Sequence, residues 1–286
     1  MSAYSELSDA DRMALRDQFQ RDGIVRVKGL LDPALLAECR RCYDWSVANP
    51  SPLAQILYPG TRHQHFVDFT NPAADAMYRS LVHQPVFADV LANLMGSEHV
   101  WYYSEEIFAK RGALAGRTVW HQDTSYHPWG GLQWANIWIS FESLPAHNSL
   151  EVVRGSHLGP QYDGAGLVAD PEGPPTPLHG GQWLPLPDIE RERSEAPGSW
   201  DILSYAGEPG DVIILNSRAL HGGAPVDEAT PDRSTLVLRF YGDDAFYQPL
   251  PHDTKYFLKG EDVYKAQWGH LKPGDPIRSP LFEQIR

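Results

Sequence analysis

Three residues of this sequence have the types and spacing needed to share one metal ion. His121 and Asp123 are two positions apart, so on a β-strand their side chains would point to the same side. The third ligand we expect is His221, which follows the apolar run 212–215. Two imidazoles and one carboxylate on one face of an iron leave other positions open, as in non-haem Fe(II) oxygenases. The sequence therefore predicts a metal site suited to oxygen chemistry.

The order of the surrounding residues strengthens this interpretation. A lone His-x-Asp pattern arises often by chance and is weak by itself. Here a second histidine follows a Pro-Gly-Asp turn and an apolar run, and Arg233 lies twelve residues beyond His221. These features, met in order along the chain, favour a metal site over coincidence.

For the other histidines and the nearby aromatic residues, a structural role is more common than a role in binding. His127 is near the predicted ligands in the sequence and could line a substrate pocket, whereas Tyr126, Trp129 and Trp134 are more typical of a core. The remaining candidates by residue type are expected to be surface or hydrogen-bonded side chains, with His157 in a turn. They are His63, His65, His147, His157 and His179.

Helical patterns dominate the first hundred residues. Ser8 to Asp11 resembles a capping box, and Asp32 followed by Pro33 is typical of a helix start. We expect helices over 8–23, 32–48 and 72–96, the last interrupted near Pro85, together with a strand over 24–28 and a loop over 49–60.

Beyond residue 100 the pattern changes to short apolar or alternating runs separated by Gly, Pro and Asn. These runs predict strands over 100–108, 134–141, 150–153, 212–215 and 235–241. Strands spaced in this way are typical of a β-sandwich or barrel. The segment 159–199 is rich in Pro and Gly, and we interpret it as a long insertion over the open end of the barrel, a possible lid.

Composition limits the class of protein. A chain of 286 residues with 42% hydrophobic residues can bury a large core, and we expect a single domain over 1–286. The net charge of −13 and the absence of a basic block argue against nucleic acid and anionic membranes as partners. No apolar stretch is long enough to span a membrane, and the first residues lack a signal-peptide pattern. We therefore expect a soluble cytoplasmic monomer or homodimer.

Cys39 and Cys42 form a Cys-x-x-Cys pattern. Redox-active pairs of this kind are placed at a helix N-terminus, where the thiol pKa falls. The helix predicted to begin at Asp32 would place both thiols about two turns inside it, and a zinc site would need a second ligand pair. We expect two structural thiols on the flank of a helix.

Taken together, these motifs resemble those of the phytanoyl-CoA dioxygenase family of Fe(II)/2-oxoglutarate oxygenases. The resemblance spans roughly residues 23–241. It implies a mainly β fold with flanking α-helices around a double-stranded β-helix, the jelly-roll core of cupin-like proteins. It is carried by His121-Gln122-Asp123, Tyr126, Pro128, Trp138, residues 148–150, 154–157 and 208–211, His221-Gly222 and Arg233.

The resemblance also implies roles for individual residues. His121, Asp123 and His221 would hold Fe(II), and Arg233 would bind the distal carboxylate of 2-oxoglutarate. A guanidinium suits that task because it makes two parallel charge-assisted hydrogen bonds to a carboxylate. Trp138 falls where the family has a tryptophan beside the co-substrate, although the preceding loop is one residue shorter here.

The sequence departs from the family pattern at two positions. Some relatives have a Ser or Thr two residues after the distal histidine, where this chain has Gly223. A family lysine that contacts 2-oxoglutarate is replaced by His65. By contrast Asp123 is retained, whereas the family's halogenases have a small residue there to admit chloride, so oxygen chemistry is favoured over halogenation.

The function we expect is a dioxygenase that uses Fe(II), 2-oxoglutarate and O2 to hydroxylate an unactivated carbon of a small-molecule metabolite, releasing succinate and CO2. Two alternatives are a cupin-like metalloenzyme that needs no 2-oxoglutarate, against which Arg233 argues, and a non-catalytic ligand-binding protein on the same scaffold. An acyl-CoA substrate would favour clustered basic residues, and the acidic composition argues against it.

Overall fold

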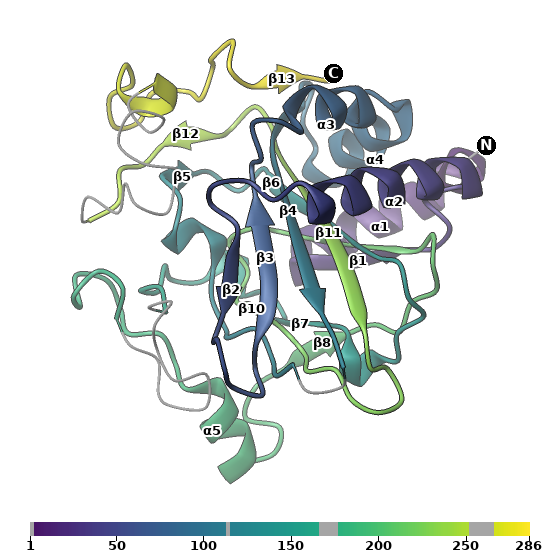
Figure 1. The fold of residues 1–286 in the computed structure, drawn as a ribbon. Coiled ribbons are helices and arrows are strands. Elements are labelled where there is room, and N and C mark those ends of the chain that lie inside the picture. The colour runs from purple at the N-terminus through teal and green to yellow at the C-terminus, as the bar shows by residue number, and fades with distance from the viewer. Residues whose placement is uncertain (1–2, 113–114, 166–176, 252–265) are drawn as a thin grey trace.

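Antiparallel strands and a group of N-terminal helices make up the molecule (Figure 1). The computed structural model describes residues 3–112, 115–165, 177–251 and 266–286. The helices are α1 (Asp9–Asp22), α2 (Pro33–Ala48), α3 (Asp75–Val82), α4 (Pro85–Met95) and α5 (Ile189–Glu195). Short 3-10 helices cover Ala3–Glu6, Asp123–Ser125, Ala146–Asn148 and Ser156–Leu158.

Two sheets form the jelly roll. The large sheet has the order β1 (Ile24–Val27), β9 (Val212–Leu215), β6 (Trp134–Ser140), β11 (Arg233–Tyr241), β4 (Trp101–Lys110), β3 (His65–Phe69) and β2 (Gln55–Leu57), and β13 (Glu283–Gln284) pairs with β4. The small sheet has the order β10 (His221–Gly223), β7 (Leu150–Val153) and β8 (Ile202–Ser204). A separate pair joins β12 (Phe246–Tyr247) to β5 (Trp129–Gly130). This arrangement confirms the predicted double-stranded β-helix with flanking helices.

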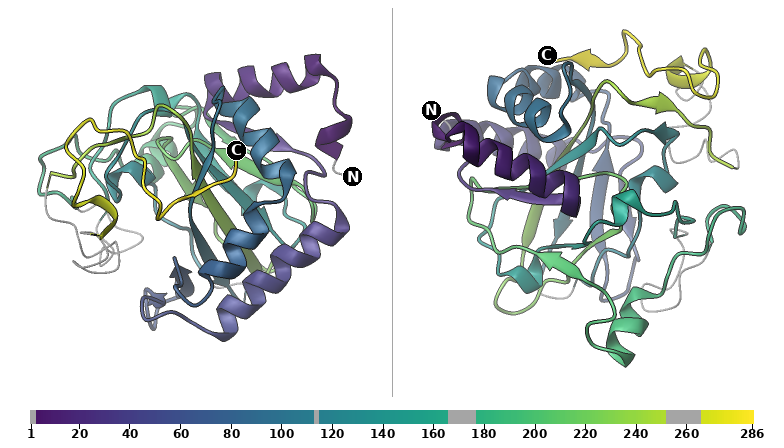
Figure 2. Two further views of the ribbon diagram at one scale, coloured as in Figure 1. Left: turned by 90° about the horizontal axis from the view of Figure 1, so that it is seen from above. Right: turned by 180° about the vertical axis from the view of Figure 1, so that it is seen from behind.

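The two faces of the large sheet have different neighbours because side chains alternate along a strand. On β11, Leu236, Leu238 and Phe240 point outward and belong to the main apolar core with residues of α1 to α4. Figure 2 shows these four helices together on one side of the strands. The alternate residues of the same strand face the small sheet and line a cavity. The large sheet therefore separates a helix-covered core from the interior of the jelly roll.

Local chemistry fixes the first helices as the sequence predicts. The Ser8 side chain accepts a hydrogen bond from the backbone of Asp11, and α1 ends at Gly23, which has a left-handed φ of 75°. Asp32 caps α2 by accepting from the backbone of Ala34 and Leu35, with Pro33 at the first turn. The helical region after residue 72 is divided at Pro85 and ends at Gly96, also as expected.

The segment between α2 and α3 differs from the expectation. Residues 49–60 were predicted to be loop, yet they contain β2, which pairs with the unpredicted strand β3 at the edge of the large sheet. Both strands exist because β3 pairs with β4, a long-range contact that no local pattern of these short runs reveals.

The described parts of the 159–199 insertion pack against the segment that carries the first two predicted ligands. The backbone of Tyr162 donates to the side chain of Gln122 at 2.8 Å, and Glu190 of α5 accepts from the indole of Trp120 at 2.6 Å. Residues 166–176 of the insertion, including most of its proline-rich run, lie outside the described residues. A role as a lid stays a prediction.

Cys39 and Cys42 are both free and buried on α2. Burial raises the pKa of the Cys42 thiol to about 11 and that of Cys39 further. Both thiols are therefore protonated near neutral pH, which agrees with the structural role expected for them.

Among the described residues, no helix combines the length and the apolar character needed to cross a membrane.

We expect Gly23→Ala to destabilise the fold more than Gly60→Ala. Both glycines have a φ of +75°, so alanine strains either position by roughly 1–2 kcal/mol. A Cβ at Gly23 would also lie 2.5 Å from Nδ1 of the buried His157, whereas nothing lies within 4 Å at Gly60. Urea unfolding of the two variants measures the difference, and equal losses would contradict this packing at the end of α1.

Candidate metal centre and its cavity

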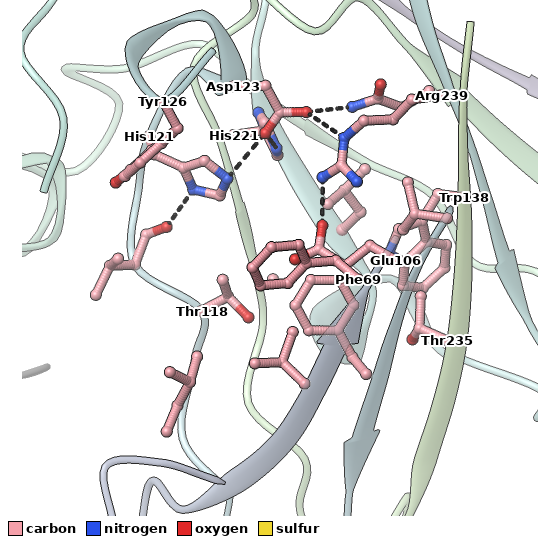
Figure 3. A pocket seen from close by; sticks show the side chains of 18 of the residues that line it. Phe69, Glu106, Thr118, His121, Asp123, Tyr126, Trp138, His221, Thr235 and Arg239 are labelled. Atoms are coloured by element: carbon pink, nitrogen blue, oxygen red, sulfur yellow. Dashed lines mark hydrogen bonds and ion pairs between the residues drawn. The ribbon is translucent and has the colours of Figure 1, made fainter. Parts of the chain in front are cut away.

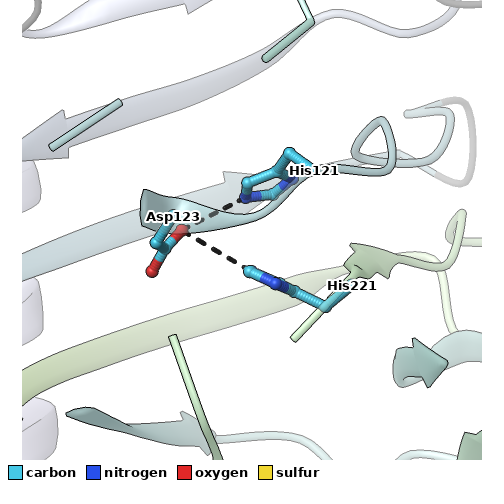
Figure 4. Close-up of side chains that lie close together, drawn as sticks. All are labelled: His121, Asp123 and His221. Atoms are coloured by element: carbon cyan, nitrogen blue, oxygen red, sulfur yellow. Dashed lines mark ion pairs between the residues drawn. The ribbon is translucent and has the colours of Figure 1, made fainter. Parts of the chain in front are cut away.

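The three predicted ligands meet between the two sheets (Figure 4). Nε2 of His121 lies 3.4 Å from Oδ1 of Asp123, and Nε2 of His221 lies 3.7 Å from the same oxygen. One donor atom from each residue falls within 4.8 Å of the other two, and this is the one such group of three found in the described chain. Two imidazole nitrogens and a carboxylate oxygen are the donor set that Fe(II) accepts with positions left open, so the residues present fit the predicted metal.

Backbone carbonyls orient both imidazoles. Nδ1 of His121 lies 2.8 Å from the carbonyl oxygen of Val119, and Nδ1 of His221 lies 2.9 Å from that of Ala219. A carbonyl only accepts, so Nδ1 must carry the proton in each ring. The lone pair is then on Nε2, the atom directed at Asp123. The rings are prepared for metal binding by the kind of outer contact that metal-bound histidines usually make.

The backbone at the ligands differs in part from the expected strand. His121 forms only an isolated bridge with His221, through two N–H to carbonyl hydrogen bonds of 2.9 Å. Asp123 already begins a 3-10 helix. The residue between them, Gln122, is extended and turns its side chain away to the carbonyl of Arg218 at 2.8 Å. The predicted same-side placement is therefore correct, but a bridge and a turn produce it rather than a regular strand.

The second oxygen of Asp123 is held away from the metal side. Oδ2 accepts from Nδ2 of Asn136 at 2.6 Å and from Nε of Arg239 at 3.2 Å. Asn136 is itself fixed because the hydroxyl of Ser217 donates to its Oδ1 at 2.8 Å. With Oδ2 occupied in this way, Oδ1 is the oxygen left for a metal.

Arg239 and Glu106 are residues of the candidate site that the sequence analysis missed. The Arg239 guanidinium bridges Asp123 and Glu106, and all three side chains face the cavity. Alternation from Arg233 along β11 puts Arg239 on the same face, so a charged residue within the apolar stretch 236–241 was the available signal. Its partners could not be read, because they depend on which strands lie beside β11.

The electrostatics of Asp123 and His221 suit metal binding. Burial alone would raise the pKa of Asp123, but the charge of Arg239 and the nearby imidazoles of His121 and His221 outweigh it and hold that pKa well below its usual range. Burial, followed by the charge of His121, lowers the pKa of His221 to about 4. Asp123 is therefore an ionised carboxylate and His221 a neutral imidazole near neutral pH, the protonation states that a metal requires.

A cavity of about 380 Å³ opens beside the triad (Figure 3). Arg233 and Trp138, predicted to contact the co-substrate, both line it, and Arg233 is the first residue of β11 as expected. The Arg233 guanidinium lies 5.8 Å from the centre of the Trp138 ring. The structure thus brings all five predicted site residues to one cavity.

The other expected histidines and aromatic residues divide between cavity and core. His127 and Tyr126 line the cavity, whereas Trp129 and Trp134 belong to an aromatic core cluster. His65 also lines the cavity and is 3% exposed. The rest lie outside the cavity lining: His157 is in a 3-10 turn as expected, His147 is exposed, and His63 and His179 are buried.

The comparison with protein families gives the chain an identity. The family described as phytanoyl-CoA dioxygenase (PhyH) matches residues 19–230, most of the sequence. The chain belongs to this family. PhyH proteins are Fe(II)- and 2-oxoglutarate-dependent oxygenases, and His121, Asp123 and His221 form a candidate site for the iron.

Solved structures share the PhyH fold of this chain. The non-heme α-ketoglutarate-dependent epimerase SnoN from nogalamycin biosynthesis is 20% identical with a TM-score of 0.69, over 98% of this chain and 100% of its own. The carbocyclase SnoK from the same biosynthesis is 19% identical with a TM-score of 0.70, over 100% and 99%. EctD from S. alaskensis, solved with 2-oxoglutarate and 5-hydroxyectoine, is 21% identical with a TM-score of 0.62, over 94% and 85%.

Arg239→Lys should weaken metal binding by roughly tenfold to a hundredfold, the usual effect of losing a partner of a ligand. One ammonium cannot reproduce the fork through which the guanidinium reaches Asp123 and Glu106. Anaerobic Fe(II) titration of the apoprotein measures the change.

The matched control is Arg154→Lys, because Arg154 also bridges two carboxylates, those of Asp22 and Asp201, but does so outside the cavity. Unchanged Fe(II) affinity in Arg239→Lys, or an equal loss in the control, would contradict a positioning role for Arg239.

Proposed function

We propose that this PhyH protein is a hydroxylase of a small molecule, with Fe(II) held by His121, Asp123 and His221 and 2-oxoglutarate held by Arg233. When bound, the metal and the keto acid supply the oxidising chemistry, in which 2-oxoglutarate and O2 become succinate and CO2 while the substrate is oxidised. The chain's own contribution is to bind, orient and shield the reacting groups.

The observation that supports the proposal is a pair of buried basic side chains beside the triad. Arg233 is 4% and Lys110 is 1% exposed, and the two residues are directly opposite each other on β11 and β4. Within the described residues neither has an ion-pair partner: Arg233 donates to the carbonyl of Asn148, and Lys110 to that of Gly116. Burial lowers the pKa of Arg233 to about 10 and that of Lys110 well below its usual value.

A buried guanidinium without an ion-paired carboxylate is costly unless an anion is bound nearby. The distal carboxylate of 2-oxoglutarate is such an anion, and Arg233 can meet it with two parallel hydrogen bonds. Arg233 also lies close to the metal ligands, because a Cβ built on Gly223, two residues after His221, would be 3.0 Å from its Nη2. This geometry favours a keto acid that reaches from Arg233 to the metal, and argues against a cupin-like enzyme that uses none.

Proteins of this fold carry out several reactions, and hydroxylation is the one that we propose for this chain. The names of the similar structures include an epimerase, a carbocyclase and a protein solved with 5-hydroxyectoine. The presence of Asp123 as third ligand supports transfer of oxygen rather than of a halide. Mass analysis of the product distinguishes the outcomes, because hydroxylation adds one oxygen atom, ring closure removes two hydrogens and epimerisation leaves the mass unchanged.

Anaerobic titration of the apoprotein with Fe(II) and then 2-oxoglutarate should produce a weak visible charge-transfer band. His221→Ala should abolish the band because a ligand is lost, and His147→Ala, which alters an exposed histidine, should leave it intact. A folded protein that binds Fe(II) but gives no band would favour an enzyme independent of 2-oxoglutarate or a non-catalytic binding protein.

Arg233→Gln should raise the 2-oxoglutarate concentration for half-maximal band intensity by roughly tenfold to a hundredfold. A hydrogen bond to a charged group contributes about 1.5–3 kcal/mol, and each 1.4 kcal/mol corresponds to about tenfold in affinity. Fe(II) affinity should not change, since Arg233 contacts none of the ligands.

Arg40→Gln, on the exposed surface of α2, is the control for the charge removed. An Arg233→Gln protein with wild-type 2-oxoglutarate affinity would remove the basis of the proposal.

A further inference from the structure

The positively charged side chains that line the cavity are bound to partners other than the substrate. Arg239 is bound to Asp123 and Glu106, and in the proposed function Arg233 is bound to 2-oxoglutarate. His65 and His127 also line the cavity, but burial lowers their pKa values to about 4 and about 3, so both are neutral. Within the described lining, no positive charge is left for an anionic substrate group.

The remaining charges that line the cavity would also balance with the metal and keto acid bound. Fe(II) and Arg233 would contribute three positive charges, and Asp123 with the two carboxylates of 2-oxoglutarate would contribute three negative ones. Lys110 is not part of the lining and donates to the carbonyl of Gly116. The ion pair of Glu106 and Arg239 adds no net charge. A substrate that brought a charge of either sign into this buried space would leave it uncompensated, which is costly at low dielectric.

Glu106 nevertheless offers an acceptor to the cavity. One of its carboxylate oxygens is taken by Arg239, and the other accepts no hydrogen bond from a described residue. Phe69 is the direct cross-strand partner of Glu106 between β3 and β4, so the two side chains lie next to each other on the cavity face, as Figure 3 shows. An acceptor beside an aromatic surface suits a hydrogen-bond donor attached to an apolar group.

From these contacts we infer that the substrate is an uncharged, hydroxylated compound that donates a hydrogen bond to Glu106 and packs an apolar face on Phe69. The inference rests on the proposed function, because it uses the charge of bound Fe(II) and 2-oxoglutarate. The cavity volume of about 380 Å³ is near the lower end of the ~300–1,000 Å³ typical of ligand sites, and 2-oxoglutarate takes part of it. A compact ring or short chain fits that space, whereas the polyphosphate of an acyl-CoA would find neither room nor cations.

Strained backbone next to Phe69 supports a binding role for this part of the cavity. Thr70 and Tyr58 have φ values of 48° and 52°, the two positive values among non-glycine residues in the described chain, and both line the cavity. Such strain persists only where surrounding structure enforces it, and it concentrates at ligand sites. Both residues end strands of the β2–β3 pair, so this edge of the sheet presents Phe69 to the substrate in a fixed conformation.

The test uses probes that differ only in charge and hydrogen bonding. Wild-type protein is first loaded anaerobically with Fe(II) and 2-oxoglutarate and checked for the charge-transfer band, whose absence would refute the proposed function itself. Calorimetric titrations then compare naphthylmethanol, naphthoate, naphthylmethylamine and methylnaphthalene. Naphthylmethanol should bind tightest, by roughly tenfold over each of the others. Equal or tighter binding of the anion or the cation, or of methylnaphthalene, would overturn the inference while the band stands.

Glu106→Gln tests the contact directly. The amide can still pack on Phe69, but its nitrogen donates rather than accepts. The ratio of the affinity for naphthylmethanol to that for methylnaphthalene, here called the affinity advantage, should therefore fall by roughly tenfold. Because Glu106 supports Arg239, this variant is titrated at saturating Fe(II) and 2-oxoglutarate, and the two probes are compared within the variant, so that a weaker metal affinity does not enter their ratio. Glu38→Gln on the outer surface of α2 should leave the affinity advantage at its wild-type value. An unchanged affinity advantage in Glu106→Gln would exclude Glu106 as the acceptor.

Discussion

The two carboxylate oxygens of Asp123 have different partners, and the rest of the site depends on this constraint. Oδ1 faces both histidines, while Oδ2 is bound by Asn136 and Arg239. A buried carboxylate is stable only when its charge is compensated, so the Arg239 contact both keeps Asp123 ionised and fixes its rotation. Because Arg239 in turn needs Glu106, the metal centre is tied to strand β4 and, through the Phe69–Glu106 pair, to β3 at the sheet edge.

Because side chains alternate along each strand, the residues of the large sheet that make these contacts all lie on its inner face. On the inner face of the large sheet, Arg239 is opposite Asn136, Val237 is opposite Glu106 and Trp138, and Arg233 is opposite Lys110. Leu236 and Leu238, which lie between them on β11, belong to the helix-covered core. A shift of one residue in the register of β11 would exchange the two sets and bury the arginines among the helices, so the packing of α1 to α4 also keeps the site in place.

Sequence reasoning succeeded where the signal was local. Ser8, Gly23 and Asp32 cap helices through contacts within a few residues, and the His121–Asp123 spacing, with His221 and Arg233 downstream, gave the residues that the fold brings together. It failed where strand pairing decides. β2 and β3 are short edge strands stabilised by β4, and the partners of Arg239 follow from the order β6-β11-β4, which no run of residues encodes. Arg239 itself was accessible from alternation.

The two departures from the family pattern show why position in space matters more than position in sequence. Gly223 lacks the hydroxyl that some relatives have there, yet a Cβ at that point would lie 3.1 Å from Oγ1 of Thr118. Thr118 is held by a hydrogen bond of 2.7 Å from its backbone to the carbonyl of Gly223 and lines the same cavity. In the same way, where the resemblance implies a lysine at the position of His65, Lys110 is buried opposite Arg233. A hydroxyl and an amine are thus present at this end of the jelly roll, supplied by neighbouring segments, because an anion responds to the local arrangement of donors and charge.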